Sequence, residues 1–160
     1  MRVEYINPFV EAAFSAIQEY LHGDHGEVKR GDIYLKPTSV KIMGVAVLVG
    51  LAGDVEGRVI FDMTKDRALH VVSVMNGEKF TVLDEMAKAT IQELANQITA
   101  QAITKLHDLG FKFDLTPPAL FIGDNMEVAS TSSLEVLVVP VELGDKGKIE
   151  VNVAIRERVK

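Results

Sequence analysis

The sequence predicts a single α+β domain in which long helices pack against one face of a largely antiparallel sheet. Three observations support this prediction. Two β-rich segments contain hairpin turn signals, several segments carry apolar residues at helical spacing, and the order helix then hairpin occurs twice. Successive hairpins form antiparallel sheets, and amphipathic helices can cover such a sheet on one face. We therefore expect one domain over residues 1–160, built from two loosely repeated helix-plus-hairpin units.

The composition is that of an ordinary folded domain. The chain has 160 residues, of which 48% are apolar and 25% charged, so it can bury a core. Its net charge of −6 argues against nonspecific binding to nucleic acid or anionic membranes, which attract basic surfaces. Cysteine is absent, which excludes disulfides and thiolate catalysis. We find no signal-like or membrane-spanning apolar stretch and expect a cytoplasmic protein.

The first predicted element is an amphipathic helix with recognisable ends. Asn7 is a favourable N-cap, Pro8 suits the first helical position, and Gly23 suits a left-handed stop. Apolar residues at helical spacing define its buried face: Phe9, Val10, Ala13, Phe14, Ile17 and Leu21.

A loop over residues 24–38, with a short edge strand near residues 33–35, leads to the first hairpin. Its strands are predicted at about residues 40–51 and 57–63, around a Gly-Asp turn. The first strand is apolar almost throughout, so we expect it to be covered on both faces or to lie in the centre of the sheet.

Two helices follow this hairpin. The first is short and runs from an N-cap at Thr64 to a stop at Gly77. The second is long; Thr81 and Asp84 resemble a capping box at its start, and Gly110 is its stop. Its apolar stripe is continuous: Leu83, Ala87, Ile91, Leu94, Ile98, Ala102, Leu106 and Leu109.

The last part of the chain predicts further strands. After a Thr-Pro-Pro connection, candidates lie at residues 119–122 and 127–129. A second hairpin is expected from residues 133–143 and 148–156, around the glycine-rich turn 144–147.

Several apparent functional motifs have simpler structural explanations. Glycines 44, 50, 53 and 57 could suggest a phosphate-binding loop, but that loop needs a helix directly after its glycines. Gly57 instead leads into another predicted strand. We therefore assign these glycines to the hairpin turn and to close strand packing.

The histidines and serines give no strong site either. His22 and His25 flank an aspartate and could bind a metal with it, but no further ligand cluster accompanies them, which favours a solvated loop. His70 and His107 are isolated on helices. The polar stretch 130–133 suits a turn better than a nucleophile.

The long helix carries the most informative polar pair. If Leu94 marks the centre of the buried stripe, Glu93 lies about 100° and Asn96 about 160° around the helix on the same side. Both point outward and are surface neighbours. Ala89 lies one turn before Glu93, and Ala100 lies one turn after Asn96. Their short side chains allow another molecule to approach the helix closely. From spacing alone, a solvated helix face remains the alternative.

The stretch Glu93-Leu-Ala-Asn96 matches the Glu-x-x-Asn motif of the CheC/CheX/FliY chemotaxis phosphatases, and the chain resembles this family over most of residues 7–156. Further similar segments are Gly44–Gly50, Gly57–Phe61, Ala68–Met75, Leu83–Glu85, Leu109–Gly110 and Asp114–Pro118. The first helix carries no second motif, which is the CheX pattern rather than the CheC pattern. One departure is Ala89, where the family usually has Asp or Ser.

The resemblance implies a CheC-like fold, a homodimer formed through the sheets, and a phosphorylated CheY-like response regulator as substrate and partner. It further implies that Asn96 orients the attacking water and that Glu93 contacts the regulator's lysine. Ala89 and Ala100 would leave room for the docked partner. No cofactor is then required from this chain, because Mg²⁺ is expected in the regulator.

Two alternatives stay open. CheC-like domains of flagellar motor switch proteins have the fold without the motif and serve in assembly. With Ala89 in place of Asp or Ser, the chain could similarly be a non-catalytic module that binds a response regulator or a switch component. A helix-on-sheet domain of other function, with a merely solvated Glu93 and Asn96, is the second alternative.

Overall fold

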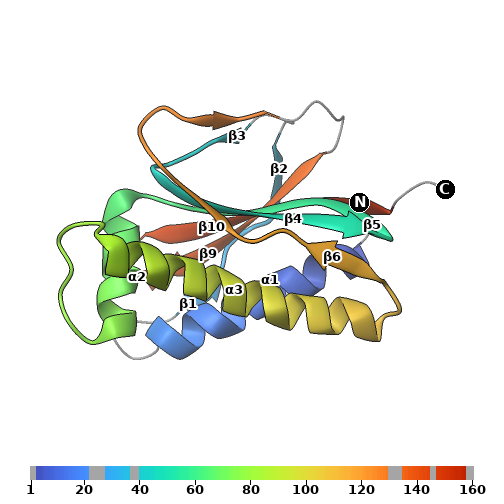
Figure 1. Cartoon of the computed structure of the whole chain (residues 1–160), viewed down its shortest axis with the longest axis horizontal. Coiled ribbons are helices and arrows are strands. Elements are labelled where there is room, and N and C mark those ends of the chain that lie inside the picture. The colour runs from blue at the N-terminus through green and yellow to red at the C-terminus, as the bar shows by residue number, and fades with distance from the viewer. Residues whose placement is uncertain (1–2, 22–27, 37–39, 130–134, 145–146, 158–160) are drawn as a thin grey trace.

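The computed structural model describes residues 3–21, 28–36, 40–129, 135–144 and 147–157, and shows three helices on one face of a sheet (Figure 1). The helices are α1 (Val3–Leu21), α2 (Lys65–Asn76) and α3 (Glu85–Asp108). The strands are β1 (Val28–Arg30), β2 (Tyr34–Lys36), β3 (Val40–Lys41), β4 (Val45–Gly53), β5 (Val55–Met63), β6 (Phe113–Leu115), β7 (Ala119–Ile122), β8 (Glu127–Val128), β9 (Val136–Leu143) and β10 (Lys148–Glu157). The predicted α+β architecture is confirmed.

The two predicted hairpins form the middle of the sheet. The strand order is β1-β9-β10-β5-β4-β6, with β2 also paired to β9 and β7 also paired to β4. All of these pairs are antiparallel. Because α1 precedes hairpin β4–β5 and α3 precedes hairpin β9–β10, the two units meet through their second strands, β5 and β10. This arrangement agrees with the predicted repeat of helix-plus-hairpin units.

Gly57 shows why the first hairpin is rich in glycine. Its φ of +143° is rarely adopted by other residues, and a Cβ at this position would lie 1.9 Å from the carbonyl oxygen of Ala154 on β10. Gly53, at the hairpin end of β4, has a φ of +141°. The assignment of these glycines to the hairpin turn and to close strand packing, rather than to a phosphate loop, is confirmed.

The start of α1 was predicted wrongly. The helix begins at Val3, so Asn7 is not its N-cap and Pro8 lies inside it. An internal proline removes one helical hydrogen bond, and sequence rules therefore place it at a helix start. Tertiary packing outweighs that loss here, because Ile6, in the turn before Pro8, is buried in the core. The predicted stop at Gly23 lies outside the described residues.

Some strands also differ from the prediction. The segment expected as one strand over residues 40–51 is divided, because Gly44, with a φ of +148°, separates β3 from β4. The predicted edge strand near residues 33–35 is present as β2. The three-residue strands β1 and β6 were not predicted, since they are too short to show a period and exist through pairing with β9 and β4.

The second face of the main sheet is partly covered by β3 and β8, which pair with each other as a separate small sheet (Figure 1). Ile42, Ala46 and Ile60 form a buried cluster there, with Leu48, Met126 and Val128 packed against it. Ala46 lies on β4, and its neighbours Val45 and Val47 on that strand belong to the main core on the helical side of the sheet. The apolar sequence of β4 is thus explained by coverage on both faces, as predicted.

The ends of α2 and α3 largely follow the sequence signals. Thr64 caps α2 through its side-chain oxygen, and Gly77 ends it in the left-handed conformation. Asp84 caps α3, accepting a first-turn N–H at 2.8 Å, whereas Thr81 takes no part in this cap. Gly110, with a φ of +95°, follows the last turn of α3. The predicted capping box is therefore a simple aspartate cap.

This cap predicts a difference between two single replacements. Asp84→Ala is expected to lower the free energy of unfolding by about 1 kcal/mol, because the Ala87 N–H in the first turn of α3 loses its hydrogen-bond acceptor. Thr81→Ala is the matched control and is expected to change stability by less than about 0.5 kcal/mol. Urea denaturation of both variants measures the difference. Equal losses would show that the cap assignment is wrong.

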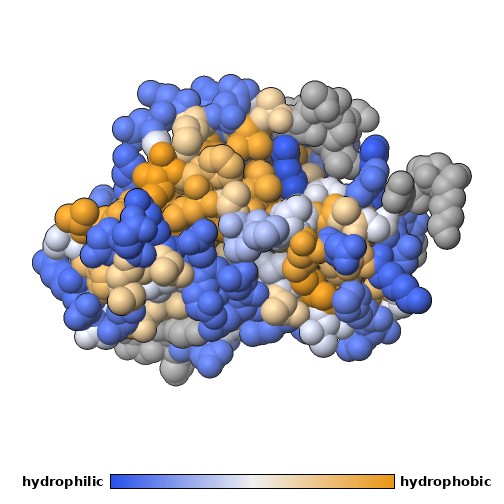
Figure 2. Space-filling view, viewed as in Figure 1, coloured by the Kyte–Doolittle hydropathy of each residue, from blue (hydrophilic) through white to orange (hydrophobic). Residues whose placement is uncertain are grey.

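The outer surface is not uniform. Figure 2 shows apolar side chains gathered over β7 and the neighbouring region toward β3, whereas hydrophilic side chains predominate on the helical side. Phe121 and Ile122 of β7 are 42% and 36% exposed. Within the part of the chain that the structure describes, none of the helices has the length and apolarity needed to cross a membrane.

Two carboxylates face each other in the middle of the sheet, on the side opposite the helices. Asp62 of β5 lies directly opposite Glu150 of β10, and their exposed fractions are 0% and 4%. Glu150 receives a hydrogen bond from the Tyr34 hydroxyl and lies 3.5 Å from the Lys36 ammonium and 3.6 Å from that of Lys148. Burial and the nearby charge of Glu150 both disfavour the ionised form of Asp62, so this carboxylate is expected to lower the stability of the folded protein when it is charged.

Candidate functional site

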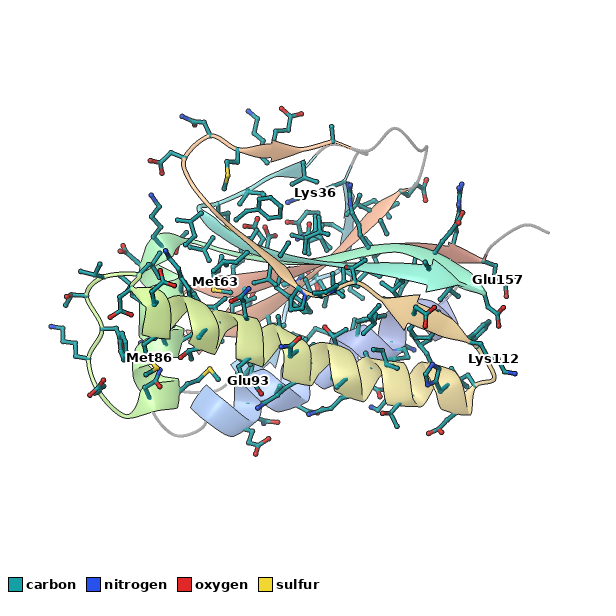
Figure 3. All side chains as sticks on the ribbon, in the orientation of Figure 1. Lys36, Met63, Met86, Glu93, Lys112 and Glu157 are labelled. Carbon is teal, nitrogen blue, oxygen red and sulfur yellow. The ribbon has the colours of Figure 1, made fainter. Side chains whose placement is uncertain are left out.

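The predicted polar pair lies on the outer surface of the helical layer. Glu93 and Asn96 are both exposed, and Figure 3 labels Glu93 near the middle of α3. The two residues between them, Leu94 and Ala95, are 4% and 2% exposed and belong to the core. The outward orientation inferred from helical spacing is therefore confirmed.

Close packing on α1 sets the orientation of α3. The inner face of α3 includes small residues, Ala95, Thr99 and Ala102, and α1 is its main helical neighbour. Small buried side chains are also found on α1: Ala12, Ala13 and Ala16. Since small side chains allow helices to approach closely, this packing fixes the rotation of α3 and keeps the opposite face outside. The Thr99 hydroxyl is satisfied within the helix by the Ala95 carbonyl, 2.6 Å away.

Ala89 and Ala100 are exposed on α3, one turn on either side of the polar pair. Their short side chains project little from the helix, so another molecule can approach the backbone closely at both places. The structure thus shows both alanines exposed beside the polar pair, as the sequence predicted.

The Glu93 carboxylate has a hydrogen-bond donor on its own helix, which sequence reasoning missed. Gln97 Nε2 lies 3.3 Å from Glu93 Oε1, and Gln97 itself is half-buried. The spacing of four residues is the one at which helical side chains meet, so it was the available signal. Sequence alone does not decide which rotamers the two side chains adopt.

The Asn96 side chain is differently placed. In the described part of the chain, no hydrogen bond engages its carboxamide, and the residue is exposed. An exposed amide without an internal partner is available to a water molecule or to another protein.

Thr90 is the hydroxyl-bearing residue closest in sequence to Ala89, but it serves a different contact. Its Oγ1 donates to the Met86 carbonyl oxygen at 2.9 Å and accepts from Asn76 Nδ2 at 3.0 Å. Since Asn76 ends α2, these bonds connect α2 to the first part of α3. Thr90 therefore does not orient the polar pair.

Other candidate residues do not form a site in the described structure. The His107 ring packs against Phe113, with 5.0 Å between ring centroids, and His70 is half-buried on α2. His22, His25 and residues 130–133 lie outside the described residues. Among the residues that are described, no group of three or more His, Cys, Asp or Glu could hold a metal ion.

The polar pair stands on a convex helix surface rather than in a cleft. An open groove does exist between α1 and α3, but it includes neither Glu93 nor Asn96. Its lining residues are Asn7, Pro8, Glu11, Lys105, Asp108 and Leu109. A convex pair cannot enclose a small substrate, whereas it can enter a concave site on another macromolecule.

Known proteins share both this fold and the segment that carries the pair. The family model described as chemotaxis phosphatase CheX matches residues 45–142, which include hairpin β4–β5 and all of α3. The CheY-P phosphatase CheX of Thermotoga maritima is 26% identical over 161 residues, and the alignment covers 98% of each chain.

Solved structures agree with this comparison. The crystal structure of the CheX–CheY–BeF₃–Mg²⁺ complex from Borrelia burgdorferi contains a chain that is 43% identical, with a TM-score of 0.83 and coverage of 98% of this chain and 100% of that chain. A CheC-like superfamily protein from Shewanella sp. PV-4 is 26% identical, with a TM-score of 0.84 and coverage of 98% and 99%.

Proposed function

The chain belongs to the CheX family of chemotaxis phosphatases, and we propose that it hydrolyses the aspartyl phosphate of a CheY-like response regulator. The observation that carries this proposal is the exposed Glu93–Asn96 pair on α3, within the segment that matches the family. The names of two relatives support the substrate class, because one is a CheY-P phosphatase and the other was crystallised with CheY.

The carboxamide of Asn96 suits the task of holding the attacking water. Phosphoryl transfer depends mainly on positioning and on electrostatic stabilisation, and a nucleophilic water must lie in line with the bond that breaks. A carboxamide can accept a hydrogen bond from that water. Because the amide is neutral, it approaches the phosphoryl oxygens without the repulsion that a carboxylate would meet.

The carboxylate of Glu93 suits contact with a lysine of the regulator. A charge-assisted hydrogen bond between carboxylate and ammonium would fix the register of the two proteins, one helical turn from Asn96. Ala89 and Ala100 would leave room for the regulator around this contact. Each of the four residues thus has a task that fits its exposure and its side-chain chemistry.

This mechanism requires no metal from the chain itself. The proposed Mg²⁺ lies in the regulator, beside the acyl phosphate, and this chain contributes the water-positioning amide and the docking carboxylate. We expect the reaction to occur in the cytoplasm, where a phosphorylated response regulator would be available.

The direct test is the rate of phosphate release from a phosphorylated CheY-like regulator of the same organism. We expect catalytic amounts of the chain to accelerate release well above the regulator's own rate. Tight binding without acceleration would instead favour the alternative, a non-catalytic module for a response regulator or a flagellar switch component. If the chain neither binds the regulator nor accelerates phosphate release, the proposed function is wrong.

We also propose that the chain forms a homodimer through its sheet, at the free edge of β7. β7 pairs with β4 along one edge, and no strand of the described residues pairs with its other edge. Phe121 and Ile122 of β7 expose apolar surface. Figure 2 shows apolar side chains gathered over this strand. An open strand edge with apolar side chains is a template for pairing, and a second copy can close it by two-fold symmetry.

If this dimer forms, a single replacement at the β7 edge should halve the molecular mass of the protein in solution. Phe121→Lys is expected to convert a dimer into a monomer, because the buried interface would have to accept an unpaired charge. Leu35→Lys on β2, at a site that is 60% exposed near the opposite edge of the sheet, is the matched control and should stay dimeric. Light scattering after size-exclusion chromatography measures both masses. A monomeric wild type, or two dimeric variants, would contradict the β7 interface.

A further inference from the structure

We propose that Gln97 is a positioning residue for Glu93, holding one carboxylate oxygen so that the other faces the regulator's lysine. This inference rests on the proposed phosphatase function, because the group that Gln97 orients is the one assigned to partner contact. The structural basis is the hydrogen bond from Gln97 Nε2 to Glu93 Oε1, 3.3 Å long, between side chains four residues apart on α3.

The exposure of the two side chains indicates which of them restrains the other. Gln97 is half-buried, whereas Glu93 is exposed. Around the helix, Gln97 lies about 40° from Glu93, on the side toward the buried stripe. A half-buried side chain has fewer accessible rotamers than an exposed one, so the contact restrains Glu93 more than it restrains Gln97.

Residues one turn earlier on α3 do not provide such a restraint. Ala89 has no polar side-chain group, and the Thr90 hydroxyl is already bonded to the Met86 carbonyl oxygen. Among the described residues, Gln97 is therefore the polar side chain that orients Glu93, and it does so from the C-terminal side.

The chemistry of a carboxylate makes this arrangement compatible with docking. A carboxylate accepts through two oxygens, so an amide donor on Oε1 leaves Oε2 available to an ammonium group. Ordering Glu93 before the partner arrives reduces the entropy that is lost when the complex forms. Removal of Gln97 should therefore weaken association more than it slows turnover of the bound complex.

The first experiment compares wild type with Gln97→Met, which keeps side-chain length and removes the donor. Initial rates of phosphate release at increasing concentrations of phosphorylated regulator separate KM from kcat. We expect KM to rise roughly two- to ten-fold, with kcat within about two-fold of wild type. Gln101→Met, on the same helix, is the matched control and should leave both constants unchanged.

A second variant tests the electrostatic part of the contact. Gln97→Glu keeps the shape of the side chain but places a like charge beside Glu93, one turn away. We expect a larger increase in KM than for Gln97→Met at low ionic strength. Added salt should reduce the excess, because it screens exposed charges.

A double-mutant cycle separates positioning from a structural role. In a Glu93→Ala background, Gln97→Met is expected to cause no further change in KM, because the positioned carboxylate is already absent. A residue that only stabilised α3 would give the same loss in both backgrounds, and its replacement would lower the thermal midpoint. Additive losses in the cycle would overturn the positioning role.

Failure of this inference can be distinguished from failure of the proposed function. If wild type does not accelerate phosphate release, the function is wrong and the positioning role falls with it. If wild type accelerates release and Gln97→Met has the same KM as Gln101→Met, the function stands and the role of Gln97 is wrong.

Discussion

Replacing Asn96 with alanine is expected to reduce the stimulated release of phosphate by about 100-fold or more, because nothing would then hold the attacking water in line. The loss should appear mainly in kcat, since the water is positioned within the bound complex and Glu93 still contacts the partner. Single-turnover measurement of phosphate release, with the chain in excess over phosphorylated regulator, tests this expectation.

Two further observations make the Asn96→Ala result specific. The side chain is exposed and has no hydrogen bond within the described residues, so its removal should leave the thermal midpoint almost unchanged. Asn96→Asp, which has the same shape but a negative charge, should be as inactive as the alanine variant, because it would be repelled by the phosphoryl oxygens. Full activity in Asn96→Ala would refute the assignment of this residue.

Replacing Asp62 with asparagine is expected to stabilise the protein by up to about 3 kcal/mol above pH 7. Burial raises the pKa of Asp62 from 3.8 to about 6, and the neighbouring Glu150 adds to this effect. A hydrogen bond from the Met43 N–H, 3.0 Å long, and the charge of Lys36 offset it only in part. At neutral pH the folded protein therefore contains a carboxylate that would be more stable in water.

The pH dependence of this effect follows from the direction of the pKa shift. The unfolded chain releases the Asp62 proton near pH 4 and the folded protein near pH 6, so the folded state binds more protons between these values. The destabilisation by Asp62 is thus absent below about pH 4, grows through this window, and is complete above about pH 7. Asparagine carries no charge and can still accept from Met43, so the gain in stability should show the same dependence.

Urea denaturation of wild type and Asp62→Asn near pH 4.5 and near pH 8, at equal protein concentration, measures this gain. Asp114→Asn, at an exposed position on β6, is the matched control, and its effect should stay within about 0.5 kcal/mol at both pH values. If Asp62→Asn destabilises the protein more at pH 8 than at pH 4.5, the ionised carboxylate is instead net favourable through its interaction with Lys36. An equal loss at both pH values would show that the effect does not depend on ionisation.

Within the candidate site, exposure was predictable and side-chain contacts were not. The outward orientation of Glu93 and Asn96 follows from the position of Leu94 in the buried stripe, because a regular helix has a fixed angle per residue. The bond from Gln97 to Glu93 depends on which rotamers both side chains adopt, and helical spacing permits that contact without requiring it. The catalytic and docking roles of the pair stay predictions that the experiments above test.

The sequence by itself determined the features that depend on neighbours along the chain. These are the middle of the apolar stripe of α3, the N-cap of α2 at Thr64 and its stop at Gly77, and the two hairpins of the central sheet. The predicted ends of the stripe differ, since Leu83 is half-buried before the helix begins and Leu109 is 55% exposed. Apolar periodicity, caps and turn residues act over a few positions, so they can be recognised without knowing the rest of the fold.

The tertiary structure alone decided the features that depend on residues far apart in the sequence. The packing of Ile6 extends α1 past Pro8, strand pairing creates β1 and β6, and the β5–β10 register places Asp62 opposite Glu150. The physical reason is the same in each case: burial and strand pairing with distant partners outweigh local preferences that are worth only a few kcal/mol.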